Sequence, residues 1–173
     1  MTGIGQHQPA MQPTVPPAGG GAAGIPAAPL WVALTGGALA VTGSFLAFST
    51  VQVDGGTESS GGLKGDGVYT LVAALKMLGW LVAGLLAPHV RTRLTLVAGL
   101  PALALVGLGV LNLASPERAL RSEIEKNGGS GADLDELLAL LDVSAGVGVW
   151  LVLAGGLVGL GAIAAVGLRA RRG

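Results

Sequence analysis

The sequence predicts an all-α membrane protein: a bundle of four transmembrane helices, with short extracytoplasmic amphipathic helices and a disordered amino-terminal tail. Of the 173 residues, 51% are hydrophobic and 12% are charged, whereas a soluble domain has about 25% charged residues. Four apolar runs each contain about the 20 residues that cross a hydrocarbon core. All ten acidic residues lie in two segments between these runs. Most of the chain is therefore expected to lie in lipid.

Residues 1–29 form the predicted tail. This segment contains no Lys, Arg, Asp or Glu and is rich in Pro and Gly. Proline removes backbone donors and glycine keeps the chain entropy high, so the tail is predicted to be disordered. It also lacks the basic region of a signal peptide, which predicts that the first apolar run is retained as a helix.

The remainder of the chain, residues 30–173, is the predicted membrane domain. Each apolar run is long enough, at a rise of about 1.5 Å per residue, to cross a hydrocarbon core roughly 30 Å thick. The predicted spans are about 30–49, 68–87, 94–114 and 144–168, with outer loops at 50–67 and 115–143.

Basic residues set the predicted orientation. The short flanks on one side of the predicted membrane hold five of them: Arg91, Arg93, Arg169, Arg171 and Arg172. The outer loops hold four basic residues together with all ten acids. Because short cytoplasmic flanks are enriched in Lys and Arg, both the central hairpin and the two termini are expected in the cytoplasm.

Small residues predict close contacts between the helices. The chain has 31 glycines and only 3% aromatic residues, a composition typical of membrane helices that touch through small side chains. Gly155 and Gly159 form a GxxxG motif in the fourth run. This motif predicts helix packing within the molecule, with dimerisation through the same face as the alternative.

The first outer loop contains two local signals. Val51 and Val53 alternate with polar residues, which predicts a short extended stretch. Asp66 precedes the second apolar run, where a negative charge stabilises the start of a helix, and the flanking Gly65 and Gly67 favour a turn. The acid spacing of an EF-hand is absent, so no metal site is predicted.

The second outer loop predicts two surface helices. Ser115-Pro116-Glu117 supplies a capping hydroxyl, a proline and an early acid, a pattern typical of a helix start. Asp133 and Glu136 have the spacing of a capping box. An apolar stripe with helical periodicity follows: Leu134, Leu137, Leu138 and Leu141. This stripe is expected to pack either against the membrane interface and the ends of the other helices, or against a docked partner protein.

Lys76 is the one ionisable residue predicted to lie deep within a span. A central lysine costs about 2.5 to 3.5 kcal/mol on insertion scales, so such a residue is a candidate functional site. Asp142, Asp66 and Asn112 are the candidate partners for its ammonium group. Two interpretations remain open: a paired or snorkelled lysine with a structural role, or a lysine that handles protons or anions.

Known catalytic and ligand-binding motifs are missing from the sequence. It has no cysteine, which excludes disulfides and thiolate metal sites. HExxH, GxSxG and P-loop motifs are also absent. We therefore expect a protein that is not an enzyme and has no catalytic residues, cofactor or metal. The few basic residues lie beside predicted spans, so no nucleic-acid partner is expected.

The layout resembles a loose class of small four-span membrane proteins from high-GC Gram-positive bacteria. The features that carry the resemblance are the Pro/Gly-rich tail, Gly65-Asp66-Gly67 before the second span, and Arg169-Ala170-Arg171-Arg172 at the carboxyl end. The class has no agreed activity. The resemblance implies a plasma-membrane location.

These observations favour an accessory or scaffold subunit that acts through lateral protein contacts. Its expected partners are the lipid bilayer and another membrane protein, or a second copy of itself. The alternative is a small oligomeric transporter or channel component in which Lys76 handles charge.

Overall fold

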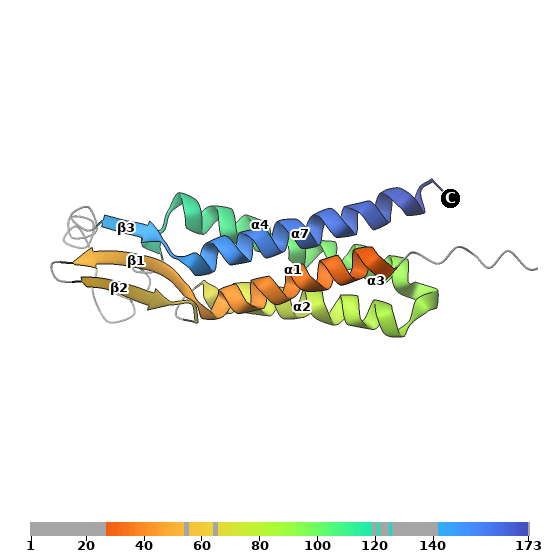
Figure 1. Cartoon of the computed structure of the whole chain (residues 1–173), viewed down its shortest axis with the longest axis horizontal. Coiled ribbons are helices and arrows are strands. Elements are labelled where there is room, and N and C mark those ends of the chain that lie inside the picture. Colours follow the sequence, from red (N-terminus) through yellow and green to blue (C-terminus); the bar gives the residue numbers. More distant parts are fainter. Residues whose placement is uncertain are drawn as a thin grey trace, which may run out of the picture.

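The computed structural model describes residues 27–53, 56–63, 66–118, 121, 125 and 142–172. It is an elongated bundle of helices with a small sheet at one end (Figure 1). The long helices are α1 (Ala27–Phe45), α2 (Gly67–Leu86), α4 (Gly99–Ala114) and α7 (Val147–Ala170). Two short helices, η1 (Pro88–Val90) and α3 (Arg91–Val97), connect α2 to α4.

The four helical segments form a ring. α1 packs against α2 and α7, and α4 packs against α7 and α2. The α1–α7 contact is the most extensive and the α2–α4 contact is the sparsest of the four. The four segments are 18 to 27 residues long and apolar enough to cross a membrane. The fold is therefore compatible with a multi-pass membrane protein.

The structure includes an antiparallel sheet that the all-α prediction lacks. Its strands are β1 (Ala47–Val53), β2 (Gly56–Gly61) and β3 (Asp142–Ala145), in the order β2-β1-β3. β1 pairs with both neighbours, with Val51 opposite Glu58 on one side and Val143 on the other. The extended stretch predicted around Val51 is thus confirmed, and the chain is mostly helical with a small sheet.

The sheet also moves two span boundaries. The first helix ends at Phe45, because the end of the predicted span 30–49 belongs to β1. The fourth begins at Val147, because Ser144 and Ala145 form ladder pairs with β1. The second helix matches its predicted span of 68–87 to within one residue.

Pro101 interrupts the third membrane segment. This segment starts earlier than the predicted 94–114, at Pro88, and runs to Ala114. Its α-helical part is broken at Ala98, between α3 and α4. Proline has no N–H and its ring clashes with the carbonyl group four residues before it, which here belongs to Val97, the last residue of α3. The α-helix is therefore interrupted for one residue at Ala98, whose backbone keeps helical dihedral angles (φ −61°, ψ −15°).

The second outer loop is described in part. Glu117, Arg118, Arg121 and Glu125 have helical backbone, in agreement with a helix that starts after Ser115. The predicted leucine stripe at Leu134, Leu137, Leu138 and Leu141 lies outside the described residues, as does the amino-terminal tail up to residue 26.

Small residues allow α1 and α7 to approach closely. A Cβ atom added to Gly36 would lie 2.6 Å from the carbonyl oxygen of Gly155 and 2.8 Å from the amide nitrogen of Gly159. One added to Gly43 would lie 2.7 Å from the carbonyl oxygen of Gly148. Backbones therefore touch along most of this helix pair, as small residues permit in membrane bundles.

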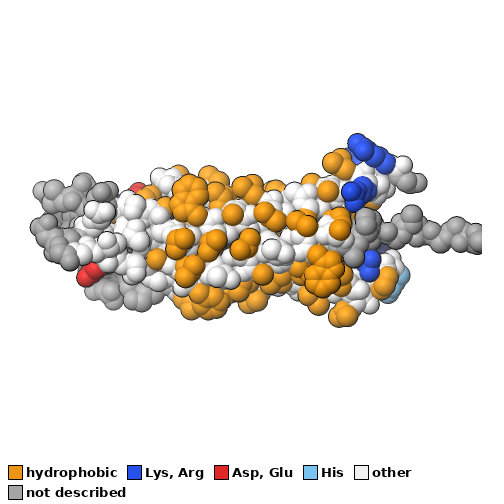
Figure 2. Space-filling model, viewed as in Figure 1, with side chains coloured by type: hydrophobic (Ala, Val, Ile, Leu, Met, Phe, Trp, Pro, Cys, Tyr) orange, Lys and Arg blue, Asp and Glu red, His pale blue; other side chains and the backbone are white. Residues whose placement is uncertain are grey.

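The surface is divided into three zones along the long axis (Figure 2). The middle zone is apolar. At one end, which we call the arginine end, the hairpin and the carboxyl terminus bring together Arg91, Arg93, Arg169, Arg171 and Arg172. The opposite end carries the sheet, and we call it the sheet end. Polar ends around an apolar belt are the surface pattern expected of a membrane-spanning protein.

Exposed aromatic side chains lie toward both edges of the apolar belt. Trp31, near the start of α1, and Trp80, in the second half of α2, lie toward the arginine end. Tyr69 and Trp150 lie in the first turns of α2 and α7, at the sheet end. Amphipathic aromatic rings favour the level of the lipid headgroups.

Candidate functional site

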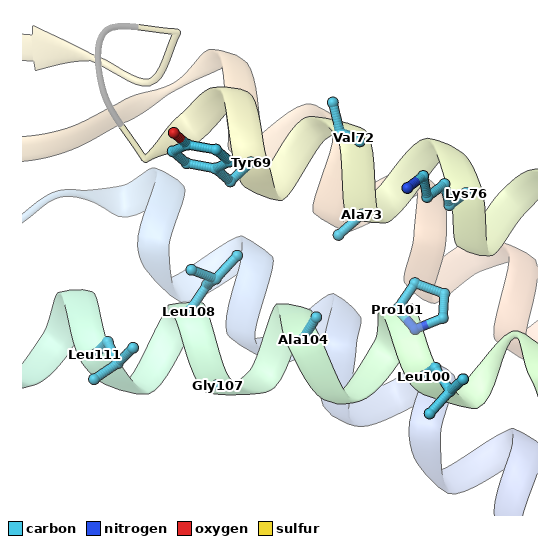
Figure 3. Close-up of a pocket in the computed structure, with 10 residues that line it drawn as sticks. All are labelled: Tyr69, Val72, Ala73, Lys76, Leu100, Pro101, Ala104, Gly107, Leu108 and Leu111. Atoms are coloured by element: carbon cyan, nitrogen blue, oxygen red, sulfur yellow. The ribbon is translucent and has the colours of Figure 1, made fainter.

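A groove between α2 and α4 is the candidate functional site. It has a volume of about 670 Å³ and is walled by one face of each helix (Figure 3). All its lining side chains are apolar or aromatic except Lys76. Of the neighbouring pairs of long helices, α2 and α4 have the fewest contacts, and the groove lies between them.

Small residues leave this space between the helices. Ala73 projects from α2, and Ala104 and Gly107 face it from α4. A Cβ atom added to Gly107 would meet no atom within 4 Å. Leu100 and Tyr69 line the groove with exposed side chains, 70% and 66% accessible respectively.

A second hollow continues along α2 toward the arginine end. It has a volume of about 510 Å³ and is lined by Lys76, Gly79, Trp80 and Ala83. Lys76 borders both hollows. Together they follow α2 from Tyr69 to Ala83, a length of about 21 Å at the rise of an α-helix.

Lys76 lies on the outward face of α2. Its side chain is exposed, whereas Ala74 and Met77, on the other side of the helix, are fully buried in the core. The ammonium group points toward the amino-terminal end of α2 (Figure 3), as expected from the tilt of side chains in an α-helix. Within the described part of the chain, no hydrogen bond or ion pair reaches it.

Two of the predicted partners of Lys76 bind each other instead. Asn112 Nδ2 donates to Asp66 Oδ2 at 3.3 Å and to the carbonyl oxygen of Leu108 at 2.9 Å. Asn112 is only 2% exposed. Asp66 lies at the start of α2, as predicted. It is the N-cap residue, but its carboxylate makes no capping hydrogen bond. The bond therefore joins the two helices that wall the groove.

The third predicted partner, Asp142, lies in β3, with its backbone opposite Gln52. The side chain of Asp142 lies outside the described part of the structure, so its pairing with Lys76 stays a prediction. Gly155 and Gly159 both lie on the face of α7 that meets α1, and a Cβ atom on Gly159 would also collide with Met77 of α2.

A buried hydroxyl pair connects α1 to α2 and was not predicted. Ser44 Oγ and Thr70 Oγ1 lie 2.9 Å apart. Each hydroxyl also lies within hydrogen-bonding distance of a carbonyl oxygen of its own helix, Ser44 Oγ 2.8 Å from that of Ala40 and Thr70 Oγ1 2.9 Å from that of Gly67. Because each hydroxyl has one proton, one of the two donates to its carbonyl oxygen while the other donates across to its partner. Since Ser and Thr satisfy themselves in this way at many helix positions, no sequence signal marks the pair.

A hydrogen bond also joins two helices at the arginine end. Arg91 Nε donates to the carbonyl oxygen of Gly84 at 3.2 Å, which fastens the start of α3 to the end of α2. Thr95 Oγ1 donates to the carbonyl oxygen of Arg91 at 2.8 Å. Among the described residues, no three His, Cys, Asp or Glu side chains are grouped so as to hold a metal ion.

Comparison with known proteins gives no match, neither to a protein-family model nor to a curated protein or a solved structure. The geometry of the groove is therefore the main guide to function.

Proposed function

We propose that this chain is a multi-pass plasma-membrane protein that acts as an accessory or scaffold subunit, and that it binds another membrane protein laterally through the α2–α4 groove. The observation that carries the proposal is the position of Lys76. Its side chain is exposed in an apolar groove and has no partner among the described residues. Intramembrane ionisable residues of this kind mark functional sites.

The energetics of Lys76 support a partner. A lysine at the centre of a span costs about 2.5 to 3.5 kcal/mol on insertion scales. Among the described residues no group pairs with Lys76, and snorkelling of its side chain toward the sheet end reduces this cost only in part. A protein that covers the groove and supplies an acceptor would offset it further, because buried charges are stabilised by pairing.

A transport role finds less support in the geometry. A proton or ion path requires polar groups in the interior of the bundle. Among the described residues the buried polar side chains of the helices lie toward the two ends, Ser44, Thr70 and Asn112 at the sheet end and Thr95 at the arginine end. The residues of α2 that follow Lys76 on the buried face, Met77 and Leu81, are apolar. Because Lys76 faces outward, transport would need a second molecule to complete the path. Lateral binding needs only the groove that is present.

The proposed orientation places the arginine end in the cytoplasm. α1 begins and α7 ends at this end (Figure 1), so both termini are cytoplasmic on this proposal. The five arginines follow the preference of Lys and Arg for short cytoplasmic flanks. The sheet then lies outside the cell.

Site-specific photocrosslinking in native membranes tests the proposal. A photoreactive phenylalanine derivative replaces Ala104, which is exposed in the groove, and in a control replaces Leu157, which is exposed on α7. We expect a single protein adduct of defined mass from position 104 and none from position 157. The adduct is identified by mass spectrometry and verified by the reciprocal crosslink. Only homodimeric adducts would favour the transporter alternative, and adducts with lipid alone would contradict lateral protein binding.

A further inference from the structure

We infer that the groove binds an apolar transmembrane helix of a different protein, and that this helix carries an Asp or Glu at the depth of Lys76. The carboxylate pairs with the Lys76 ammonium group. The inference rests on the proposed function and names the chemistry of the partner.

Charge determines the kind of partner. Lys76 is the charged side chain among the residues that line both hollows. A positive group in a low-dielectric environment is best compensated by a carboxylate, through a charge-assisted hydrogen bond. The partner helix therefore needs an acidic residue within an otherwise apolar segment.

A second copy of this chain lacks that residue. None of the four segments 28–45, 67–86, 88–114 and 147–170 contains Asp or Glu. All ten acids of the chain lie outside them. A homo-oligomer formed through the groove would leave Lys76 without a carboxylate at its own depth, so the occupant is a different protein.

Depth favours a helix over a lipid headgroup. Lys76 follows Gly67 by nine residues and precedes Leu86 by ten, so it lies about 14 Å from one end of α2 and about 15 Å from the other. These distances are longer than a lysine side chain. A headgroup phosphate at either interface stays out of contact, whereas a side chain of a spanning helix can lie at the same level.

The form of the groove fits a helix as well. The two hollows extend for about 21 Å along α2, which corresponds to about 14 residues of a parallel helix. Ala73, Ala104 and Gly107 allow a second backbone to approach closely, the usual mode of contact between membrane helices. The Asp66–Asn112 bond joins both walls at the sheet end, so the groove exists before the partner binds.

The test uses the full chain in phosphatidylcholine nanodiscs with synthetic helices as probes. Each probe is a fluorophore-labelled Leu/Ala transmembrane peptide with Glu, Gln or Leu at its centre, and association is measured by energy transfer at pH 8. We expect the Glu peptide to bind about tenfold more tightly than the Gln peptide, a difference of about 1.4 kcal/mol. Lys76→Met should abolish this preference.

A matched pair of glycine variants tests the groove itself. Gly107→Leu fills the groove and should weaken binding of the Glu and Gln peptides alike. Gly161→Leu, on α7, is the control, since a Cβ atom at either glycine meets no atom within 4 Å and both variants should fold. Equal binding of the Glu and Gln peptides, or a Glu preference that survives in Lys76→Met, would overturn the inference.

The lipid composition of the nanodiscs distinguishes a carboxylate on a partner helix from the phosphate of an anionic lipid headgroup. Phosphatidylglycerol at 30% in the nanodiscs should leave the Glu preference unchanged. If it removes the preference in wild type, the groove binds an anionic headgroup and the inference is wrong. The photocrosslinking experiment of the proposed function can be repeated with Lys76→Met. If the same protein adduct still forms, lateral protein binding holds, but the inference that the partner carries an acidic residue at the depth of Lys76 is wrong.

Discussion

Asn112 and Asp66 are hydrogen-bonded across the interface of α4 and α2, with Nδ2 and Oδ2 3.3 Å apart. Asn112 is buried and 46 positions distant from Asp66 in the sequence. The bond links a polar group near the end of one helix to the N-cap residue of another. It lies at the sheet end, where the chain passes from β2 into α2, and it joins the two helices there.

Loss of this bond should destabilise the bundle. Asn112→Ala is expected to lower the free energy of unfolding by about 1 to 3 kcal/mol, because the Asp66 carboxylate loses a buried donor. Asp66→Asn retains an acceptor oxygen and should have a smaller effect. Reversible unfolding in mixed micelles, followed by tryptophan fluorescence, measures both. If Asp66→Asn lowers the free energy of unfolding as much as Asn112→Ala does, the negative charge of Asp66, and not the hydrogen bond, stabilises the bundle.

The hydroxyl pair of Ser44 and Thr70 should show a measurable coupling energy. A double-mutant cycle of Ser44→Ala and Thr70→Val isolates the 2.9 Å contact from the bonds that each residue makes in its own helix. Interhelical hydrogen bonds in membranes contribute about 0.6 kcal/mol on average and about 1.7 kcal/mol at most. We expect a coupling energy in this range. A value of zero would mean that the two hydroxyls are satisfied without each other.

Gly36 should tolerate no side chain. Gly36→Ala places a methyl group against the backbone of Gly155 and Gly159, and overpacking of this kind costs about 1 to 3 kcal/mol. Gly161→Ala is the control, because its Cβ atom meets no neighbour. The measurement is again unfolding in mixed micelles, together with the oligomeric state by light scattering. Loss of a dimer with unchanged monomer stability would instead support the alternative that the GxxxG face mediates dimerisation.

The orientation can be tested by labelling of introduced cysteines, since the natural sequence has none. Cysteine at Thr57 in β2, an exposed position, should react with an impermeant maleimide in intact cells. Cysteine at His89, exposed in the hairpin, should react only after the membrane is permeabilised. The reverse pattern would place the arginine end outside and contradict the proposed orientation.

Hydropathy predicted the four helical segments because burial in lipid requires long apolar runs, and α2 was located to within one residue. Hydropathy did not predict the sheet. β2 reads Gly-Thr-Glu-Ser-Ser-Gly and has no apolar alternation. β3 reads Asp-Val-Ser-Ala and alternates over only four residues, the shortest length at which this pattern indicates a strand. β2 follows β1 directly along the chain, whereas the pairing of β3 with β1 brings together segments about 90 residues apart, which local sequence does not encode.

The candidate site was predictable only in part. Lys76 was marked by its charge within an apolar run, but the face of α2 that carries it depends on how the helix is rotated in the bundle. The separation of α2 from α4 depends on contacts that α1 and α7 make elsewhere. For the same reason, the sequence offered Asp66 and Asn112 as partners of Lys76, whereas the fold brings them to each other.

The sheet is continuous with the most tightly packed helices. Only Leu46 separates α1 from β1, and only Gly146 separates β3 from α7, with its amide nitrogen donating to the carbonyl oxygen of Phe48 at 2.9 Å. Each junction is thus one residue long, and the Gly146 hydrogen bond ties the start of α7 to β1. We therefore expect the α1–α7 pair and the strands β1 and β3 to behave as one rigid unit, to which α2 and α4 are attached by fewer contacts.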